Sequence, residues 1–383
     1  MRVLHIVLNN FTHDSRVLRA CETGLGFFGE VDVFALHAAG LPAKETQTGI
    51  TVHRFRLWTR SWPKVVWIQL FKYVELFSRM IFDGLRLRPQ VVHAHDLNAL
   101  PMAFMIARMC RAKLIYDSHE YWADVEGYRE FPHFLLSNIL RAEKFLARRA
   151  DRVVTVSQAI AEKLKADYGL KHVTVVRNMP RQWRVDRNRL LLRKSLHLDK
   201  DAIIFLYQGG IAMDRGVGLL FDAFRTVTVA GTWLVYLGDG PAVRELRQRT
   251  AAAAAPNVLF HAGVTPEDLP RYTCDANVGV LPQLPVSQNS VMALPNKLFE
   301  YVQGGLALIG ADLPEISKVI RDSRIGLTFT PGQVCDLAVA IETLASDHML
   351  RQKYREMALI HAETLCWEKE NLELVSMYRG LVE

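Results

Sequence analysis

The sequence predicts an α/β protein made of two doubly wound, Rossmann-like domains. Short β-branched runs alternate with helical patterns along nearly the whole chain, which is typical of parallel sheets covered by helices. A polar, basic and weakly patterned stretch at 179–200 interrupts this alternation once. The length of 383 residues also suits two domains of ordinary size.

The first series of elements begins at the N-terminus. Its short apolar runs predict buried parallel strands, at 3–8, 31–36, 91–95, 113–117, 152–157 and 173–178. Helical patterns lie between them, for example at 98–110 and 137–149. This order of elements predicts a doubly wound unit.

The second series repeats the alternation after the polar stretch. Strands are predicted at 202–209, 232–240, 258–263, 277–282 and 306–311. Helices are predicted at 216–229, 241–250, 266–273, 296–303, 333–346 and 348–362. We therefore divide the chain into domains 1–180 and 181–365, followed by a C-terminal segment, 366–383.

The composition of the chain indicates the kind of partner it binds and the compartment where it works. The net charge of +7 and the pI near 9.1 favour anionic partners. The five cysteines are far apart and form no CxxC, which argues against a disulfide framework or structural zinc site. No stretch approaches the ~18–20 apolar residues of a membrane span. We expect a cytoplasmic protein, with the inner face of the cell membrane as a second expected location.

The strand ends of the first domain carry polar side chains. Asn10 follows the first strand, where neither GxGxxG nor a P-loop is present, which counts against a dinucleotide dehydrogenase. Asp14 and Arg16 are interpreted as the cap and first-turn charge of the next helix. No nucleic-acid motif is found.

Two further strand ends hold histidines. In HAHD, His93 and His95 alternate and so share one face of the strand. A zinc site lacks a third ligand here, so His93 is interpreted as a hydrogen-bonded histidine of the sheet, and Asp96 as either an N-cap or a site residue. In YDSHEYW, His119 and Glu120 stand beside aromatic residues, which fits either a sugar site or a solvated loop.

The second domain offers a glycine loop for an anion. Gly209 and Gly210 end a strand, and Arg215 precedes the next helix. Glycines let backbone N–H groups approach an anion, and a guanidinium grips phosphate with two hydrogen bonds. In HAGV, the backbone at Val264 is predicted either to meet a nucleobase or to start a helix.

The stretch LPNKLFEYVQGG supplies a second anion-binding helix start. Asn296 begins the helix, Lys297 suits a diphosphate, and Glu300 suits the vicinal diol of a ribose. The alternative is an exposed ion pair of Lys297 and Glu300, worth only ~0.2–0.5 kcal/mol.

Residues 54–88 combine three tryptophans with arginines and lysines. Two interpretations remain open: a core helix of the first domain with a basic outer edge, or a surface for an anionic membrane.

These motifs resemble the GT-B glycosyltransferases, in particular the retaining enzymes of glycosyltransferase family 4. The resemblance spans nearly the whole chain and rests on HAHD, YDSHEYW, VTVSQAIAEKL, YQGGIAMDRG, LGDGP, HAGV and PNKLFEYVQGGLALIGADLPEI. It implies an acceptor domain, a nucleotide-sugar domain, and a C-terminal helix that crosses back onto the first domain.

The resemblance also implies residue roles. Arg215 binds donor phosphate, Glu300 binds the donor ribose, and His119 approaches the transferred sugar. Lys297, Leu298 and nearby backbone line the nucleotide site. The acceptor-side candidates are His95, Asp96, Glu120 and Asn10.

Two positions depart from the family pattern. Met292 stands where the family commonly has the first of two glutamates, and Gln208 precedes the glycines where an arginine is frequent. The missing glutamate favours one alternative, a non-catalytic partner protein; a nucleotide-sugar epimerase of the same fold is another.

The resulting expectation is metal-independent, retaining transfer of a sugar from a nucleotide-sugar to an acceptor hydroxyl. His119, Arg215 and Lys297 are the catalytic candidates. No cofactor or metal is expected. The expected acceptor is a glycan, lipid-linked or a growing polysaccharide.

Overall fold

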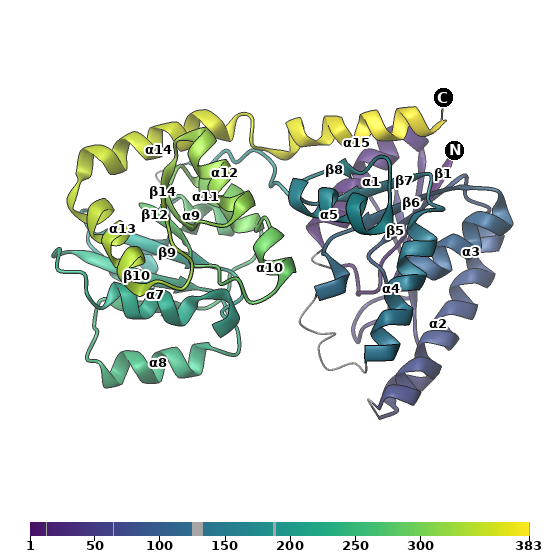
Figure 1. The fold of residues 1–383 in the computed structure, drawn as a ribbon, viewed down its shortest axis with the longest axis horizontal. Coiled ribbons are helices and arrows are strands. Elements are labelled where there is room, and N and C mark those ends of the chain that lie inside the picture. Colours follow the sequence, from purple (N-terminus) through teal and green to yellow (C-terminus); the bar gives the residue numbers. More distant parts are fainter. Residues whose placement is uncertain (13, 64, 125–132, 187–188, 383) are drawn as a thin grey trace. The chain divides into compact units, whose positions relative to one another are not determined.

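The computed structural model describes residues 1–12, 14–63, 65–124, 133–186 and 189–382 (Figure 1). The chain forms two compact units. The first comprises Met1–Arg177 with Asn371–Glu383, and the second comprises Asn178–Glu370. The sequence-based boundary between 180 and 181 lies three residues from this division.

The first unit is built on one eight-stranded sheet, in the order β3-β4-β2-β1-β5-β6-β7-β8. The strands are β1 Arg2–Ile6, β2 Glu30–Leu36, β3 Lys44–Gln47, β4 Ile50–Phe55, β5 Val91–His95, β6 Lys113–Ser118, β7 Arg152–Thr155 and β8 Thr174–Val175. All neighbouring strands are parallel except β3 and β4. The strand order reverses between β1 and β5, which is where doubly wound sheets bind ligands.

Helices connect these strands. They are α1 Ser15–Phe28, η1 Trp58–Ser61, α2 Val66–Leu87, α3 Leu100–Cys110, η2 Trp122–Asp124, α4 His133–Ala147, α5 Gln158–Tyr168 and, from Asn371 onward, α15 Trp367–Val382. The Asp14 side chain caps α1 by accepting from the Val17 N–H at 3.1 Å, as the sequence predicts.

The second unit holds a six-stranded, all-parallel sheet in the order β11-β10-β9-β12-β13-β14. Its strands are β9 Ile203–Gln208, β10 Thr232–Leu237, β11 Val258–His261, β12 Val278–Leu281, β13 Ala307–Ala311 and β14 Gly326–Phe329. The order reverses between β9 and β12, so this pair forms the switch point of the second sheet.

The helices of the second unit cover its sheet. They are α6 Leu192–Ser195, η5 Met213–Arg215, α7 Val217–Phe224, α8 Val243–Ala252, α9 Leu269–Thr273, α10 Gln288–Met292, α11 Asn296–Gly304, α12 Pro314–Ser323, α13 Val334–Ser346 and α14 His348–Ala362. Both sheets are Rossmann-like, and the predicted fold class is confirmed.

Three strands were not predicted. They are β3, β4 and β14. The β3–β4 hairpin turns at Thr48 and Gly49, both with positive φ, and its antiparallel pairing makes one edge of the first sheet mixed.

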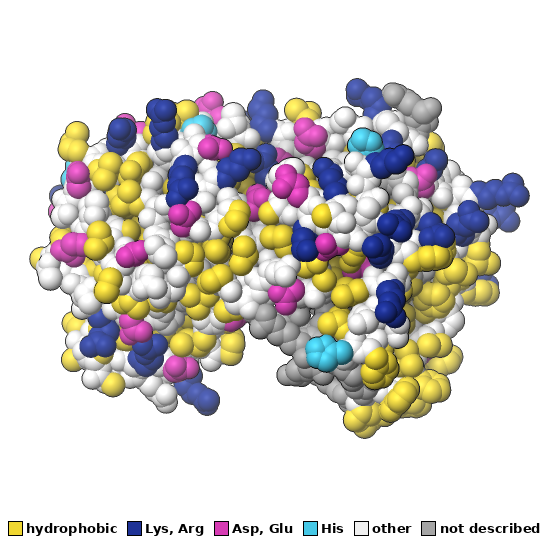
Figure 2. Space-filling view, in the orientation of Figure 1, with side chains coloured by type: hydrophobic (Ala, Val, Ile, Leu, Met, Phe, Trp, Pro, Cys, Tyr) yellow, Lys and Arg dark blue, Asp and Glu magenta, His cyan; other side chains and the backbone are white. Residues whose placement is uncertain are grey.

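The interpretation of 54–88 as a core helix with a basic outer edge is confirmed for the inner face of α2, but the outer face also exposes large apolar side chains. The inner face is buried at Leu76, Met80 and Gly84, where a Cβ on Gly84 would lie 2.6 Å from Ile106 of α3. The opposite face leaves Trp67 and Phe71 exposed. Hydrophobic side chains gather along this part of the first unit in Figure 2. None of the described helices is long and apolar enough to cross a membrane.

Candidate functional site

The glycine loop after β9 lies at the switch point of the second sheet. Gly209 has φ 101°, and its N–H donates to the Leu237 carbonyl at 2.9 Å. A Cβ on Gly238 would lie 2.1 Å from the Gly209 carbonyl oxygen, so the loops after β9 and β10 are in direct contact. Only glycine fits this approach.

Gly216 fixes the start of the next helix. It has φ 76°, and a Cβ there would lie 1.7 Å from the Pro282 carbonyl oxygen after β12. The short helix η5 therefore ends against the neighbouring strand end, and Arg215 is held next to the glycine loop.

Arg215 and Lys297 converge on the two glycines. A Cβ on Gly210 would lie 3.1 Å from an Arg215 guanidinium nitrogen, and one on Gly209 would lie 3.8 Å from Lys297 Nζ. Lys297 Nζ lies 3.8 Å from the centre of the Tyr207 ring. Gly209 and Gly210 present no side chain, and each lies next to a cation, which suits a phosphate group.

The positive charge of Arg215 makes it harder to protonate Lys297. Burial, followed by the nearby Arg215 charge, lowers the pKa of Lys297 to about 7, while Glu300 partly opposes this shift. A cation with a lowered pKa gains stability when an anion arrives. The site is therefore suited to take up negative charge.

Glu300 is held by the residue that departs from the family pattern. Gln208 Nε2 donates to Glu300 Oε2 at 2.5 Å. The Gln208 Oε1 in turn accepts from the Thr273 hydroxyl at 2.8 Å. Gln208 is buried, and its backbone N–H donates to the Tyr301 hydroxyl at 3.0 Å. Glu300 is thus anchored through a buried side chain, which an exposed ion pair with Lys297 would not require.

The remaining donor-side candidates differ in what they expose. Asn296 is exposed at the start of α11, and no side chain of the described chain caps this helix start. Leu298 is fully buried in the core, and its N–H donates to the Pro295 carbonyl. Val264 follows Gly263, whose N–H donates to Asp239 Oδ2 at 3.0 Å. This bond joins the loops after β10 and β11.

In the first unit, His119 lies between two carboxylates. Its Nδ1 is 3.3 Å from Asp96 Oδ2, and its Nε2 is 3.3 Å from Asp117 Oδ2. Burial opposes charging, but Asp96 and then Asp117 outweigh it and raise the pKa of His119. Asp96 has φ 69°, a conformation that costs energy in a residue other than glycine and is frequent at functional sites.

Arg16, interpreted from the sequence only as a charge of the first helical turn, forms a buried ion pair. It is buried, and its guanidinium donates to both carboxylate oxygens of Asp117, at 2.6 and 3.0 Å. Burial alone would raise the pKa of Asp117, but Arg16, together with His119 and His95, holds it well below its usual range. This pair was not predicted, because its members are 101 residues apart.

A row of buried histidines continues inward from His119. His95 Nδ1 is 3.3 Å from His119 Nε2, and His95 Nε2 is 3.0 Å from His5 Nδ1. His93 and His95 stack at 4.4 Å, and His93 contacts the Tyr378 hydroxyl at 3.1 Å. The prediction of His93 as a hydrogen-bonded histidine of the sheet is confirmed.

Two groups in this row have the size of a metal site: one made of His5, His93 and His95, the other of His95, Asp117 and His119. His5, which lies beside His93 and His95, was not singled out from the sequence. Arg16 already occupies both oxygens of Asp117, so a metal ion there would meet a fixed positive charge. In the other group, burial and the neighbouring histidine charges lower the pKa values of His5 and His93.

Glu120 and Asn10 are two further acceptor-side candidates. Glu120 is exposed. Asn10 lines a pocket of about 460 Å³ at the ends of β1, β2 and β4, together with Phe55 and Leu57.

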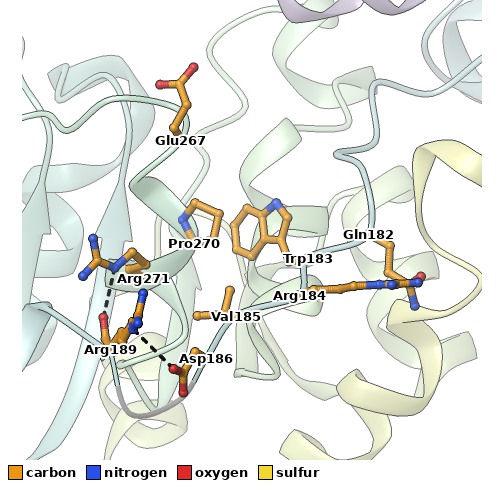
Figure 3. A pocket seen from close by; sticks show the side chains of 9 residues that line it. All are labelled: Gln182, Trp183, Arg184, Val185, Asp186, Arg189, Glu267, Pro270 and Arg271. Atoms are coloured by element: carbon orange, nitrogen blue, oxygen red, sulfur yellow. Dashed lines mark hydrogen bonds and ion pairs between the residues drawn. The ribbon is translucent and has the colours of Figure 1, made fainter.

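A further pocket lies in the second unit and contains none of the predicted site residues (Figure 3). Its volume is about 430 Å³. Its lining includes Trp183, Arg184 and Arg271, and Arg271 donates to the Arg189 carbonyl at 3.0 Å. We assign it no role.

Both units of the chain match known families of glycosyl transferase domains. A glycosyl transferase 4-like domain matches residues 16–179, and a glycosyl transferases group 1 domain matches residues 202–347. Together the two matches cover most of the chain. The fold and these two matches place the protein in the class of GT-B glycosyltransferases. The chain belongs to this family, in its family 4-like branch.

Individual relatives are distant. The sulfoquinovosyl transferase SQD2 of Arabidopsis thaliana is 22% identical over 327 residues, which is 81% of this chain and 60% of that protein. The putative teichuronic acid biosynthesis glycosyltransferase TuaH of Bacillus subtilis (strain 168) is 24% identical over 212 residues, 54% of this chain and 52% of that protein. The chain therefore spans little more than half the length of these curated relatives.

Solved structures share the fold over the whole chain. Sucrose-phosphate synthase from Thermosynechococcus elongatus superposes with a TM-score of 0.77 at 17% identity, covering 100% of this chain and 99% of its own. Anabaena HepE in complex with UDP and glucose superposes with a TM-score of 0.76 at 16% identity, covering 99% and 100%.

Proposed function

We propose that the protein is a retaining glycosyltransferase that moves a sugar from a nucleoside diphosphate donor to an acceptor hydroxyl. The observation that carries this proposal is the group at the β9–β12 switch point: two cations beside a glycine loop, and a carboxylate fixed by Gln208. Diphosphate and ribose are the chemical groups that such a set recognises. The relatives named above bear transferase names, and HepE was solved with UDP and glucose.

In this proposal the donor phosphates lie over Gly209 and Gly210. Arg215 and Lys297 stabilise the negative charge that grows on the leaving diphosphate. Glu300 accepts hydrogen bonds from the ribose. No step requires a metal ion, because the two cations and backbone N–H groups supply the positive potential.

The transfer follows front-face attack. The bond between the anomeric carbon and the diphosphate oxygen breaks, and the bond from the acceptor oxygen to the same carbon forms on the same face. The acceptor proton passes to the leaving phosphate oxygen. His119, whose pKa is raised by Asp96 and Asp117, donates a hydrogen bond to a hydroxyl of the transferred sugar.

We further propose that the acceptor is lipid-linked or a growing polysaccharide, and that the reaction serves synthesis of a cell-surface polysaccharide or glycolipid at the inner face of the membrane. The name of TuaH, a putative teichuronic acid biosynthesis glycosyltransferase, supports the polysaccharide part of this proposal.

The test is a thermal-shift panel of UDP, GDP, ADP and dTDP with their common sugars, first without metal and then with magnesium. Ligand at ~100 times its dissociation constant adds ~2.7 kcal/mol of stability. One diphosphate should stabilise the protein without metal, and Glu300→Ala should lose this shift. Two results would point to the alternatives. An altered sugar nucleotide without transfer, found by product analysis, indicates an epimerase. The absence of a thermal shift from every nucleotide indicates a non-catalytic partner.

A further inference from the structure

A pocket in the first unit has an uncompensated positive lining. It has a volume of about 460 Å³, and its lining includes Arg60, Lys72 and His37 but no carboxylate. Lys72 Nζ donates to the Trp62 carbonyl at 2.7 Å, and Arg60 donates to the His37 carbonyl. Among the described residues, both cations thus contact carbonyl oxygens, and neither is neutralised by an acid.

The rest of the pocket is largely apolar. Leu36, Phe55 and Leu57 contribute its walls, and Asn10 adds a polar group at the end of β1. A pocket lined by both cations and apolar side chains suits an amphiphilic ligand with an anionic head.

The elements that supply the two cations also carry an exposed aromatic surface. We call it the η1–α2 surface, and it consists of Trp58, Trp62, Val65, Trp67, Leu70, Phe71 and Val74. Trp58 is 82% exposed and Trp67 is 78% exposed. On α2 these positions follow helical spacing, so they form one stripe on the face opposite the core. Figure 2 shows the hydrophobic side chains gathered along this side.

The η1–α2 surface is braced. The Glu75 carboxylate accepts from the backbone N–H groups of Trp58 and Thr59, at 2.8 and 3.2 Å, and the Arg79 guanidinium lies 5.3 Å from the centre of the Trp58 ring. Trp58 is therefore exposed on an anchored element, and Trp67 lies within α2.

We propose that the η1–α2 surface docks on an anionic lipid bilayer and that the adjoining pocket holds a phosphate-bearing lipid headgroup between Arg60 and Lys72. Tryptophans favour the interface between headgroups and acyl chains, and basic side chains are attracted to an anionic leaflet. The combination of rings and unpaired cations on the same elements favours a membrane over a second copy of this chain, which carries the same positive charge. That this lipid carries the acceptor rests on the proposed function; the docking itself does not.

The test is flotation of the whole protein with vesicles of phosphatidylcholine alone and of phosphatidylcholine mixed with phosphatidylglycerol. The protein should float with the mixed vesicles and bind the neutral ones far less. Arg60→Gln with Lys72→Gln should weaken binding to mixed vesicles about twenty-fivefold, because each basic group near the surface contributes roughly fivefold. Trp67→Ser with Phe71→Ser should weaken binding to both vesicle types.

Control variants remove the same amount of charge, or an exposed apolar side chain, at positions outside the η1–α2 surface. Lys318→Gln with Lys353→Gln removes two exposed lysines from the second unit, and Met349→Ser removes an exposed apolar side chain there. Circular dichroism checks that each variant is folded. Equal binding to both vesicle types, or equal loss in the control pair, would overturn the proposal, as would a dimer in sedimentation that Trp67→Ser with Phe71→Ser dissolves.

The nucleotide panel separates this proposal from the proposed function. If the protein binds vesicles but no nucleotide stabilises it, the membrane proposal is supported and the proposed donor site is rejected. If a nucleotide stabilises the protein but no vesicle binding is seen, the donor site is supported and the membrane proposal is rejected.

Discussion

Gln208 Nε2 donates to Glu300 Oε2 at 2.5 Å, so the position that departs from the family pattern holds the side chain proposed to bind ribose. Thr273 completes the chain by donating to Gln208 Oε1. Gln208 acts as a positioning residue, because it orients Glu300 without itself being assigned to the donor.

Replacing Gln208 tests this role. Gln208→Glu places a second carboxylate against Glu300, which raises their pKa values and favours shared protonation. Nucleotide affinity should fall about tenfold or more at pH 8 and recover partly at pH 5.5, measured by calorimetry. A merely structural role would lower affinity equally at both pH values. Thr273→Val serves as the control that removes the hydroxyl without adding charge.

Removing the phosphate-binding guanidinium should abolish most turnover. Arg215→Ala is expected to lower kcat/KM about 100-fold or more in a folded protein, since a charge-stabilising donor is worth about 3 kcal/mol. Arg215→Lys should recover only part of this, because an ammonium lacks the planar pair of donors. The exposed Arg244→Ala on α8 is the matched control. Full activity in folded Arg215→Ala would remove this residue from the site.

The lowered pKa of Lys297 predicts proton uptake on nucleotide binding. Burial and Arg215 hold this pKa at about 7 in the free protein, and a bound diphosphate raises it. Below pH 7 the lysine is already charged, so affinity should be flat. Above pH 7 binding must recharge it, so affinity should fall by about tenfold per pH unit until the pKa of the complex is reached. Calorimetry of UDP binding from pH 6.5 to 9 measures this slope, and Lys297→Gln should flatten it at weaker affinity.

Glu143 predicts a stability change far from the proposed site. It is fully buried and accepts from the Tyr116 and Tyr168 hydroxyls at 2.6 Å each, and burial raises its pKa from 4.5 to about 7. As the pH rises from 4.5 to 7, the unfolded chain releases the proton while the folded chain keeps it. The folded state therefore loses stability across that window.

Glu143→Gln removes this loss. The variant should be more stable than the parent at pH 8 by about 1 to 3 kcal/mol, and nearly equal at pH 4.5, in urea unfolding. The exposed Glu162→Gln should change neither value. A variant that is less stable at pH 8 would show that the carboxylate is held favourably in its charged form.

Local patterns in the sequence predicted the bounds of some strands and helices. The strand at 91–95 was placed at its observed bounds, and the helix at 348–362 likewise, because their apolar spacing is continuous. The pair β3 and β4 was missed: β3 is exposed at both ends and contains few β-branched residues. Its pairing depends on the turn at Thr48 and Gly49.

The site divides in the same way. Motifs next to strand ends led to His119, Arg215, Lys297 and Glu300. The partners that hold the carboxylates in place lie far away in the sequence. Arg16 binds Asp117 across 101 residues, and Gln208 binds Glu300 across 92 residues. Sequence spacing within one element reports such partners only when they are near neighbours, so these pairings required the tertiary structure.

The exposed rings of Trp58 and Trp67 affect how the protein behaves in solution. With this much apolar surface facing water, copies of the chain attract each other at short range. The net charge of +7 opposes that attraction by repulsion, which salt screens over about 10 Å at 0.1 M. Colloidal stability should therefore be best at low ionic strength and fall as salt is added, and a mild detergent that covers the rings should remove this dependence on salt.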